Sequence, residues 1–419
     1  MKTNKGFTLI ELVITMTLVI VVIMVTGTAF NSILTNTNKL TSSEESNIEG
    51  VVGLEMFRHD LQQAGFGLPQ AFLDPAPRYV EASVAPANTL NDGKGTGMAG
   101  DVPRAIASWE GLTGSDSTSE TTTYNILGGT DYLAIKATSV ATSKASQKWT
   151  YLNYSGAGGK APNRWSNAAD NFKLDDKVIV LNRAYSTTGK VTNTLVYNTT
   201  GNLTIYWPGN PTAIMADASF NPTNPNQTYY LYGVANDNTP HQLSMPFNRA
   251  DYFVARPSDT SKIPSTCAPN NTGILYRANI NHADGKLNYM PLLDCVADMQ
   301  VVFGWDLNGN GVIDESGAYD TNYANIPLST SIGTQKQDIK NIMESPEEIR
   351  NKLKYIKVYI MAQEGRKDSG YTNNAPIVVG DIGSLTKSYD VAALSANGWL
   401  NYRWKIYKII VRPKNLVSN

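Results

Sequence analysis

The first thirty residues constrain this chain most, because a short basic head is followed by one apolar segment that contains a single charge. Lys2 and Lys5 precede an apolar stretch from Phe7 to Phe30, in which Glu11 is the one ionisable residue. As a helix the stretch would rise about 36 Å, against about 30 Å of membrane hydrocarbon. An ionised carboxylate is costly there, so we expect it to meet an ionic partner after insertion.

Two simpler interpretations are a cleaved signal peptide and a plain signal anchor. The apolar run exceeds the apolar region of a typical signal peptide, and no small-x-small site closes it, which disfavours cleavage after the run. The two lysines favour a cytoplasmic N-terminal tail with the rest of the chain facing outward. A signal anchor remains open on residue chemistry alone.

The segment Gly6-Phe7-Thr8-Leu9-Ile10-Glu11-Leu12 resembles the class III signal of type IV prepilins and related pseudopilins. The resemblance implies that a prepilin peptidase cuts between Gly6 and Phe7 and that the new N-terminus at Phe7 is N-methylated. It also implies that Glu11 pairs with the terminal amine of a neighbouring subunit during assembly. With 419 residues, the chain is far longer than an ordinary major pilin.

The N-terminal helix is predicted to continue past the membrane as one helix ending near Ala64, because no proline occurs between Met1 and Leu68. A membrane helix followed by a separate amphipathic helix is the alternative, with soft spots near Gly27 and in segment 35–47. Gly65, Gly67 and Pro69 provide a stop. The apolar stripe expected to face a head is Ile48, Val51, Leu54, Phe57, Leu61 and Ala64.

Composition limits the chemistry of the remaining chain. With 42% hydrophobic and 17% charged residues it can bury a core, and a formal net charge of −1 gives no basic surface for nucleic acid. Two cysteines and three histidines are too few to favour zinc or haem chemistry. We therefore expect neither an enzyme nor a nucleic-acid-binding protein.

Beyond Pro69, short apolar runs alternate with segments rich in Asn, Thr, Gly and Pro, which predicts a β-rich head and an α+β fold of the type IV pilin kind. Segments 113–123 and 139–160 are predicted to be long surface loops. The predicted strands are Tyr132–Thr138, Lys177–Leu181, Thr194–Tyr197, Leu203–Trp207, Tyr229–Val234, Tyr252–Ala255, Gly273–Arg277, Met299–Phe303, Leu353–Ala362 and Tyr402–Val411.

The two cysteines are Cys267 and Cys295. An outward-facing head lies in an oxidising compartment, where a disulfide between them can persist. Such a bond would contribute about 3–4 kcal/mol in the chain-entropy model. The alternative is a pair of buried thiols.

The segment from Asp306 to Glu315 has the alternating oxygen-bearing side chains of a calcium loop, with Gly311 at the sharp turn. The twelfth position is Gly317 instead of the usual glutamate, so modest affinity is expected, and a polar β-turn is the alternative. The predicted calcium ligands are Asp306, Asn308, Asn310, Val312, Asp314 and Glu315.

Three later segments, 273–277, 291–304 and 407–415, together with the helix end 60–66, resemble the large PilW-like minor pilins. Residues from about 70 to 260 resemble no family. The resulting division is a leader at 1–6, a pilin helix at 7–65 with its transmembrane part at 7–30, and a β-rich head at 66–419, whose PilW-like part covers about 260–419.

The resemblance implies a minor pilin that takes part in type IV pilus assembly, in the initiation or tip complex because a large head would crowd the filament body. Its partners would be the major pilin, other minor pilins, the prepilin peptidase and the inner-membrane assembly platform. The chain would cross the inner membrane once, with its head in the periplasm, before reaching the pilus at the cell surface. The alternatives are a J-type pseudopilin of a type II secretion system and a pilus-borne calcium-dependent adhesin.

Overall fold

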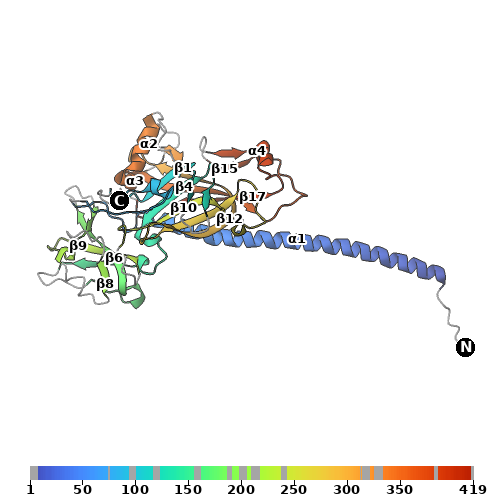
Figure 1. Cartoon of the computed structure of the whole chain (residues 1–419), viewed down its shortest axis with the longest axis horizontal. Helices are drawn as coiled ribbons and strands as arrows, with labels where there is room; N and C mark the ends of the chain where they lie inside the picture. The colour runs from blue at the N-terminus through green and yellow to red at the C-terminus, as the bar shows by residue number, and fades with distance from the viewer. Residues whose placement is uncertain are drawn as a thin grey trace.

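The protein is a large head on a long helical rod (Figure 1). The C-terminal part of helix α1 (Leu9–Gln63) lies against the head, and the N-terminal end of the helix lies far from it. The computed structural model describes residues 8–73, 76–93, 101–116, 123–154, 162–185, 191–197, 205–208, 218–236, 243–311, 313, 321–324, 334–381 and 386–416.

α1 is one unbroken helix, as predicted, and the alternative of two separate helices is not observed. It is capped at its start by Thr8 and ends before Ala64. Gly65 and Gly67 follow with φ values of 82° and 66°, a left-handed conformation that glycine adopts without steric cost. Two glycines in this conformation turn the chain sharply away from the helix axis, which confirms the predicted stop.

The head is built mainly from antiparallel sheet, which confirms the α+β prediction. Within the described residues the main sheet has ten strands in the order β1-β4-β10-β11-β12-β14-β17, with β13 paired to β12, β3 paired to β10 and β2 paired to β3. Its strands are β1 (Ile106–Glu110), β2 (Ser115–Asp116), β3 (Tyr124–Ile126), β4 (Asp131–Ala137), β10 (Asn248–Pro257), β11 (Gly273–Ile280), β12 (Leu287–Trp305), β13 (Thr321–Ala324), β14 (Leu353–Glu364) and β17 (Arg403–Val411).

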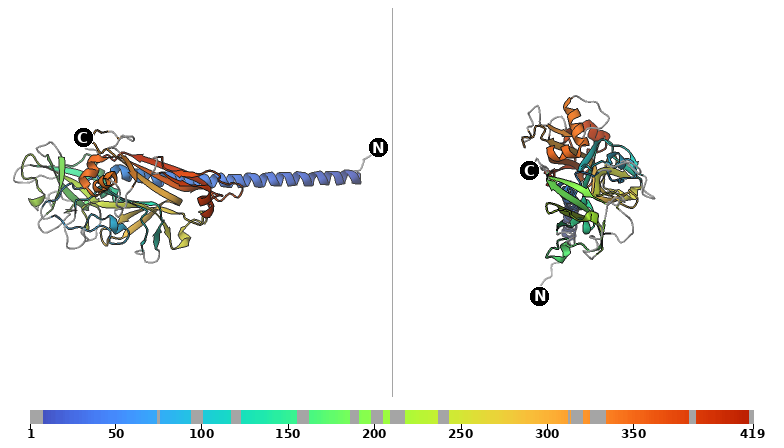
Figure 2. Two further views of the ribbon diagram at one scale, coloured as in Figure 1. Left: turned by 90° about the horizontal axis from the view of Figure 1, so that it is seen from above. Right: turned by 90° about the vertical axis from the view of Figure 1, so that its left-hand side faces the viewer.

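A second sheet of five described strands lies at the end of the head away from the α1 N-terminus (Figure 2). Its order is β5-β9-β6-β7, with β8 paired to β6, and a short β15-β16 ribbon forms a third sheet. These strands are β5 (Trp149–Asn153), β6 (Leu174–Tyr185), β7 (Val191–Val196), β8 (Ile205–Pro208), β9 (Thr228–Ala235), β15 (Ile377–Val379) and β16 (Lys387–Tyr389).

Short helices complete the described part of the head. The α-helices are α2 (Thr334–Glu344), α3 (Pro346–Lys352) and α4 (Val391–Ala396). The 3-10 turns are η1 (Ala87–Leu90), η2 (Thr138–Val140), η3 (Ala145–Gln147), η4 (Ala168–Asp170), η6 (Ala218–Phe220) and η7 (Thr260–Lys262).

Each of the ten predicted strands overlaps an observed one, but the two predicted surface loops were partly wrong. Segment 113–123 contains the two residues of β2, and segment 139–160 contains β5 together with the buried turns η2 and η3. β5 was missed because Thr and Asn alternate there with Trp, Tyr and Leu, so the apolar run is interrupted. Pairing with β9 supplies the backbone hydrogen bonds that fix it as a strand.

The C-terminal half of α1 packs on the main sheet through two glycines. A Cβ atom on Gly53 would lie 2.3 Å from the Leu292 carbonyl oxygen, and one on Gly50 would lie 3.1 Å from the Tyr407 hydroxyl. The predicted stripe is correct at Leu54, Phe57, Leu61 and Ala64, which are buried. It was wrong at Val51, which is 63% exposed, because the glycines turn the adjacent side of the helix toward the sheet.

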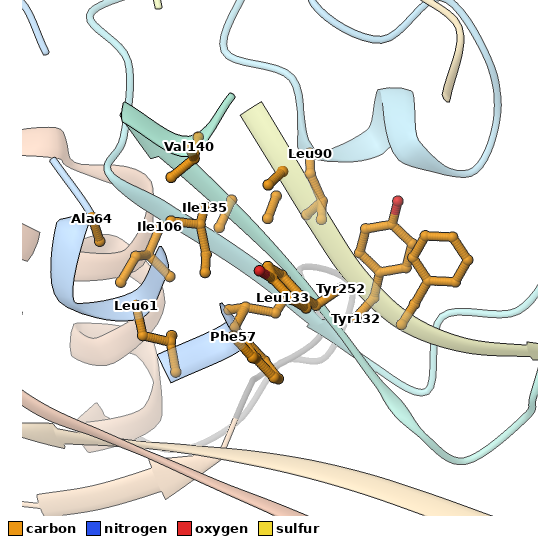
Figure 3. Close-up of a cluster of buried hydrophobic side chains, with 14 of the residues drawn as sticks. Phe57, Leu61, Ala64, Leu90, Ile106, Tyr132, Leu133, Ile135, Val140 and Tyr252 are labelled. Atoms are coloured by element: carbon orange, nitrogen blue, oxygen red, sulfur yellow. The ribbon is translucent and has the colours of Figure 1, made fainter. Parts of the chain in front are cut away.

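Aromatic and aliphatic side chains fill the space beneath this part of the helix (Figure 3). The Phe57 and Tyr252 rings stack with centroids 3.9 Å apart, and Leu61 lies beside Ile106 and Leu133 of the sheet. Most of these side chains are fully buried, so the helix end forms part of the head's main core. Burying each such side chain contributes about 1.5–3 kcal/mol.

A buried ion pair lies in the middle of this apolar contact. The Arg277 Nε atom of β11 lies 2.8 Å from the Asp60 Oδ2 atom of α1, and both side chains are less than 5% exposed. The Tyr252 hydroxyl donates a hydrogen bond of 2.7 Å to the same carboxylate oxygen, and Arg277 also donates to the Val140 carbonyl. Helix and sheet are therefore joined by charge as well as by packing.

A second buried network fastens the segment after α1 to the sheet. The Lys136 Nζ atom of β4 lies 2.8 Å from Glu81 Oε2 and 2.5 Å from Asp92 Oδ2. The Arg249 Nη1 atom of β10 lies 3.0 Å from Glu81 Oε2, and its Nε atom lies 2.7 Å from Asp251 Oδ1. All five side chains are less than a tenth exposed, so each charge is neutralised within the protein.

The Asp60→Ala variant tests the helix-to-sheet ion pair. It should lower the free energy of unfolding by about 3–5 kcal/mol, because Arg277 would remain charged and buried without its partner. Denaturant titration of the whole chain in detergent measures the loss. Glu55→Ala is the matched control, since Glu55 is an acid of the same helix whose side chain is 71% exposed. Equal unfolding midpoints for the two variants would contradict the proposed role of Asp60.

Candidate functional site

The start of α1 is a capping box that the sequence analysis did not identify. The Thr8 hydroxyl accepts a hydrogen bond of 3.4 Å from the Glu11 amide, and the Glu11 carboxylate accepts 2.9 Å bonds from the Thr8 amide and hydroxyl. The signal was present in the sequence, because a Thr followed three residues later by a Glu is typical of helix starts. Glu11 is therefore placed by its own chain before any partner arrives.

The surface that follows Glu11 is apolar and exposed. Leu9–Phe30 is a 22-residue segment with a mean hydropathy of 2.7, and none of it is buried inside the protein. The segment is long and apolar enough to cross a membrane as a helix. Gly6 and Phe7, the predicted cleavage and methylation residues, lie outside the described part of the chain.

An independent comparison identifies the same segment. Residues 1–27 match the family model described as the prokaryotic N-terminal methylation motif. The chain carries a prepilin-type methylation motif. With the apolar helix, the motif is consistent with a type IV prepilin-like protein, either pilin-like or a pseudopilin. It implies processing by a prepilin peptidase, anchoring in the membrane and assembly with other pilins.

The motif does not extend to the head. The family match ends at residue 27, and no curated protein and no solved structure gives a significant match. The PilW-like resemblance of the later segments therefore stays a prediction. The function of the head has to be argued from its own residues.

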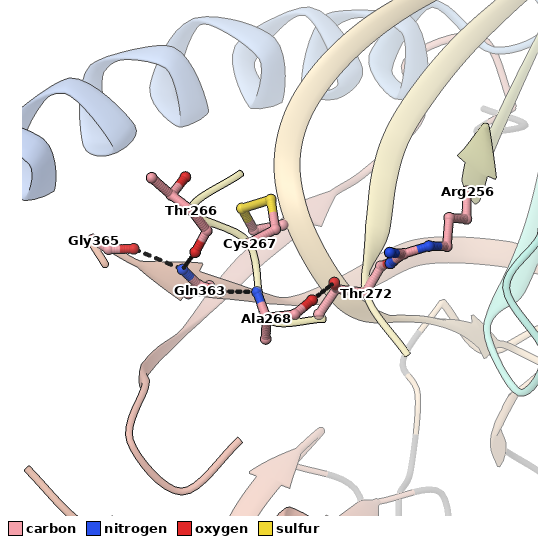
Figure 4. The surroundings of a disulfide bond; sticks show 8 residues. Arg256, Thr266, Cys267, Ala268, Thr272, Gln363 and Gly365 are labelled. Carbon is pink, nitrogen blue, oxygen red and sulfur yellow. Dashed lines mark hydrogen bonds between the residues drawn. A yellow bond between two sulfur atoms is a disulfide. The ribbon is translucent and has the colours of Figure 1, made fainter. Parts of the chain in front are cut away.

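The predicted disulfide between Cys267 and Cys295 is present, with Cα atoms 5.0 Å apart (Figure 4). Cys295 lies within β12 with a φ of 53°, where the pairing with the neighbouring strands shifts register. Gln363 of β14 holds the loop of Cys267 by accepting a 2.7 Å hydrogen bond from the Ala268 amide and donating a 2.8 Å bond to the Thr266 carbonyl. The disulfide therefore attaches the loop after β10 to the long central strand β12.

The predicted calcium loop is described only in part, because Val312, Asp314 and Glu315 lie outside the described residues. Asp306 is 1% exposed, and its carboxylate accepts hydrogen bonds of 2.7 and 2.8 Å from the Gly309 and Gly311 amides. The Lys354 Nζ atom lies 3.3 Å from the same carboxylate. Burial raises the pKa of Asp306, but these hydrogen bonds and the lysine hold it below the ordinary value.

The Asn308 side chain is also directed to a protein group. The Asn308 side-chain oxygen accepts a 2.9 Å hydrogen bond from the Asn310 amide. Across the described ranges, no group of three or more His, Cys, Asp or Glu residues is arranged to hold a metal ion. The described half of the loop is thus a turn closed by Asp306, and Lys354 already provides a positive charge beside it.

His282 occupies a partly buried position between two polar side chains. Its Nε2 atom lies 3.1 Å from the Asn248 Oδ1 atom, and its Nδ1 atom lies 3.4 Å from the Ser244 hydroxyl. The Asn248 amide group donates to two carbonyls, so its oxygen faces the histidine and assigns the proton to Nε2. Burial, and to a lesser degree Lys177, lowers the pKa of His282 to about 4. The ring is therefore neutral at ordinary pH.

Acid should destabilise the head through His282. Its pKa is about 4 when folded and about 6.5 when unfolded, so the unfolded chain binds more protons between these values. Stability should fall as pH decreases from about 6.5 to 4, with a contribution of about 3 kcal/mol, and the contribution should stop growing below pH 4.

Unfolding curves of the wild type and of His282→Gln at a series of pH values isolate this contribution from that of the carboxylates. The variant should have a flatter dependence on pH across the window. Parallel curves for the two proteins would show that His282 does not titrate on unfolding in this range.

Proposed function

We propose that the chain is a minor pilin that takes part in type IV pilus assembly, in the initiation or tip complex. The observation that carries the proposal is the fully exposed apolar helix with Glu11 as its lone charge in the described range 9–30. A helix of this kind has no apolar partner within its own chain, so it needs lipid or other helices. The methylation motif supplies the class of partner, which is other pilins.

Assembly would work by exchange of the partners of Glu11. In the single chain its carboxylate accepts two hydrogen bonds from Thr8. In the filament it would accept the charged amine at Phe7 of a neighbouring subunit instead. An ionic hydrogen bond between a carboxylate and an amine is stronger than one to a neutral amide, and more so in an apolar surrounding. Glu11 would thus favour side-by-side packing of helices in the inner membrane and in the filament.

The size and position of the head support the initiation or tip role. The head packs against one side of the C-terminal part of α1 and extends beyond its end (Figure 2). Repeated along a shaft, heads of this size would crowd one another, whereas a single copy at the tip would not. The head would face the periplasm before assembly and the cell exterior afterwards. The chain would act with the major pilin, other minor pilins and the assembly platform, by association and not by catalysis.

A J-type pseudopilin of a type II secretion system shares the same N-terminal chemistry. Neighbouring genes distinguish the two, because pilus motor and minor pilin genes would accompany a minor pilin and secretion genes a pseudopilin. Purification of the chain from membranes also distinguishes the two, because the proteins that are purified with it would be either other pilins or components of the secretion system.

Glu11→Gln and Glu11→Ala together test the proposed role of the charge. Glutamine keeps an oxygen that can complete the capping box but removes the charge, whereas alanine removes both. Both variants should insert into the membrane and be processed, and both should be absent from sheared pili. The measurement is an immunoblot of membrane and pilus fractions, with mass spectrometry of the N-terminus.

Thr17→Ala is the matched control, because the Thr17 hydroxyl bonds only to the Val13 carbonyl of its own helix in the described structure. This variant should enter pili normally. Normal incorporation of Glu11→Gln would refute the pairing of charges. If Glu11→Ala is absent from pili and Glu11→Gln is present, the role of Glu11 is helix capping instead.

Calcium binding by the loop of Asp306, Asn308, Asn310, Val312, Asp314 and Glu315 stays a prediction, and with it the calcium-dependent adhesin. A calcium ion would have to displace Lys354 from the Asp306 carboxylate. Titration of the whole chain with calcium, followed by tryptophan fluorescence, tests it. Binding of modest affinity that is lost in Asp306→Asn is the expected result, and an unchanged signal at millimolar calcium would exclude the site.

A further inference from the structure

A large cleft lies between one part of the five-stranded sheet and the rest of the head. Its volume is about 870 Å³, within the range of small-molecule sites in proteins. One wall is formed by β5, β6, β7 and β9, and the other by the turn after α1, by α3 and by the C-terminal segment 415–416. The cleft is thus built from segments that are distant in sequence and meet only in the folded head.

The sheet wall offers flat aromatic faces. Trp149 is 37% exposed, and its ring lies 6.3 Å from that of Tyr230, with 29° between the two planes. The Arg183 guanidinium lies over the Tyr230 ring at 4.5 Å. Its Nε atom donates a 3.2 Å hydrogen bond to Asn193 on the paired position of β7. The wall therefore combines the exposed ring of Trp149 with a positive charge held in a fixed position.

The strand register explains why one end of this sheet face is open to the cleft. Ile179, Leu181 and Leu195 lie on the face of the small sheet that packs into the main core, and Arg183 and Asn193 lie on the same face farther along the strands. The apolar part of the face is sealed against the head. The part with Arg183 and Asn193 opens into the cleft.

The opposite wall carries a second guanidinium. Arg350 of α3 lines the cleft, and within the described structure it makes no hydrogen bond and no ion pair within 4 Å. Burial lowers its pKa, and the neighbouring Glu347 raises it in part. Asn351 and Asn415 provide amide groups beside it. A partly buried guanidinium with unused donors is a costly arrangement that a bound anion would relieve.

The cleft also lies where a ligand outside the filament could reach it. In two views the five-stranded sheet is at the end of the molecule opposite the N-terminal end of α1 (Figures 1 and 2). If α1 anchors the chain, this end points away from the membrane or filament. The position agrees with the proposed tip role but does not depend on it.

We propose that this cleft binds an anionic saccharide. The apolar face of a sugar ring would stack on Trp149, and its anionic group would receive hydrogen bonds from Arg183 and Arg350. The amides of Asn351 and Asn415 match sugar hydroxyls, which both donate and accept. Among the charged residues that line the cleft, two arginines face one glutamate, so an acidic sugar is favoured over a neutral one.

The anionic group could be a carboxylate or a sulfate, and the probes distinguish the two. We would titrate the whole chain in detergent with sialyllactose and tetragalacturonate as carboxylated sugars, a sulfated lactose as the sulfated one, and lactose as the neutral reference. Calorimetry and quenching of tryptophan fluorescence are the readouts. At least one acidic sugar should bind, and lactose should bind at least about tenfold more weakly.

Three variants and one control locate the binding. Arg350→Gln and Arg183→Gln should each weaken binding of the acidic sugar by about tenfold or more. Neither should change the affinity for lactose much. Trp149→Ala should weaken binding of both the acidic sugar and lactose, and it should remove the quenching of tryptophan fluorescence. Arg366→Gln, at an exposed arginine outside the cleft, should leave binding unchanged.

Thermal unfolding of each variant checks that the head remains folded, and Arg350→Lys provides a milder substitution if the glutamine variant does not fold. The proposal is overturned if none of the acidic sugars binds to the folded wild type. It is also overturned if lactose binds equally well, or if Arg350→Gln and Trp149→Ala bind as the wild type does.

Discussion

The head and the rod of this protein act as one body because Asp60 and Arg277 neutralise each other beneath α1. Each charge is buried and would be costly alone, so the helix end can occupy only the position in which both are paired. The close approach at Gly53 reinforces this, since any side chain there would meet the Leu292 backbone. The helix direction relative to the sheet is therefore determined by a few contacts. A force on the rod is transmitted to β11 and β12 directly.

Much of this architecture could be predicted from the sequence, for physical reasons. The long helix follows from apolar spacing without proline, and the disulfide follows from two cysteines in an exported chain. The strands that were predicted, such as β4 and β14, have more apolar residues close together. Those that were missed, such as β5 and β15, are short or mixed, and pairing with another strand fixes them.

The parts that could not be predicted depend on contacts across the chain. Asp60 appeared as one acid on a helix surface, and only the fold brings Arg277 and Tyr252 to it. Likewise Arg183 and Arg350 are far apart in sequence and meet on facing walls of the cleft. Glu11 shows the opposite case, because its capping partner is three residues away and the pattern was readable. Local chemistry was predictable, and the site geometry that depends on tertiary contacts was not.

The buried network of Lys136, Arg249, Glu81 and Asp92 has a consequence for how the head opens. The segment that carries both acids cannot detach from the sheet without leaving Lys136 in the interior with no acid beside it and removing one of the two acids that pair with Arg249. Partial opening at this place is therefore more costly than its few backbone hydrogen bonds suggest. A protease that reached this segment could cleave it only after the head had opened there, which would give the head long resistance to digestion.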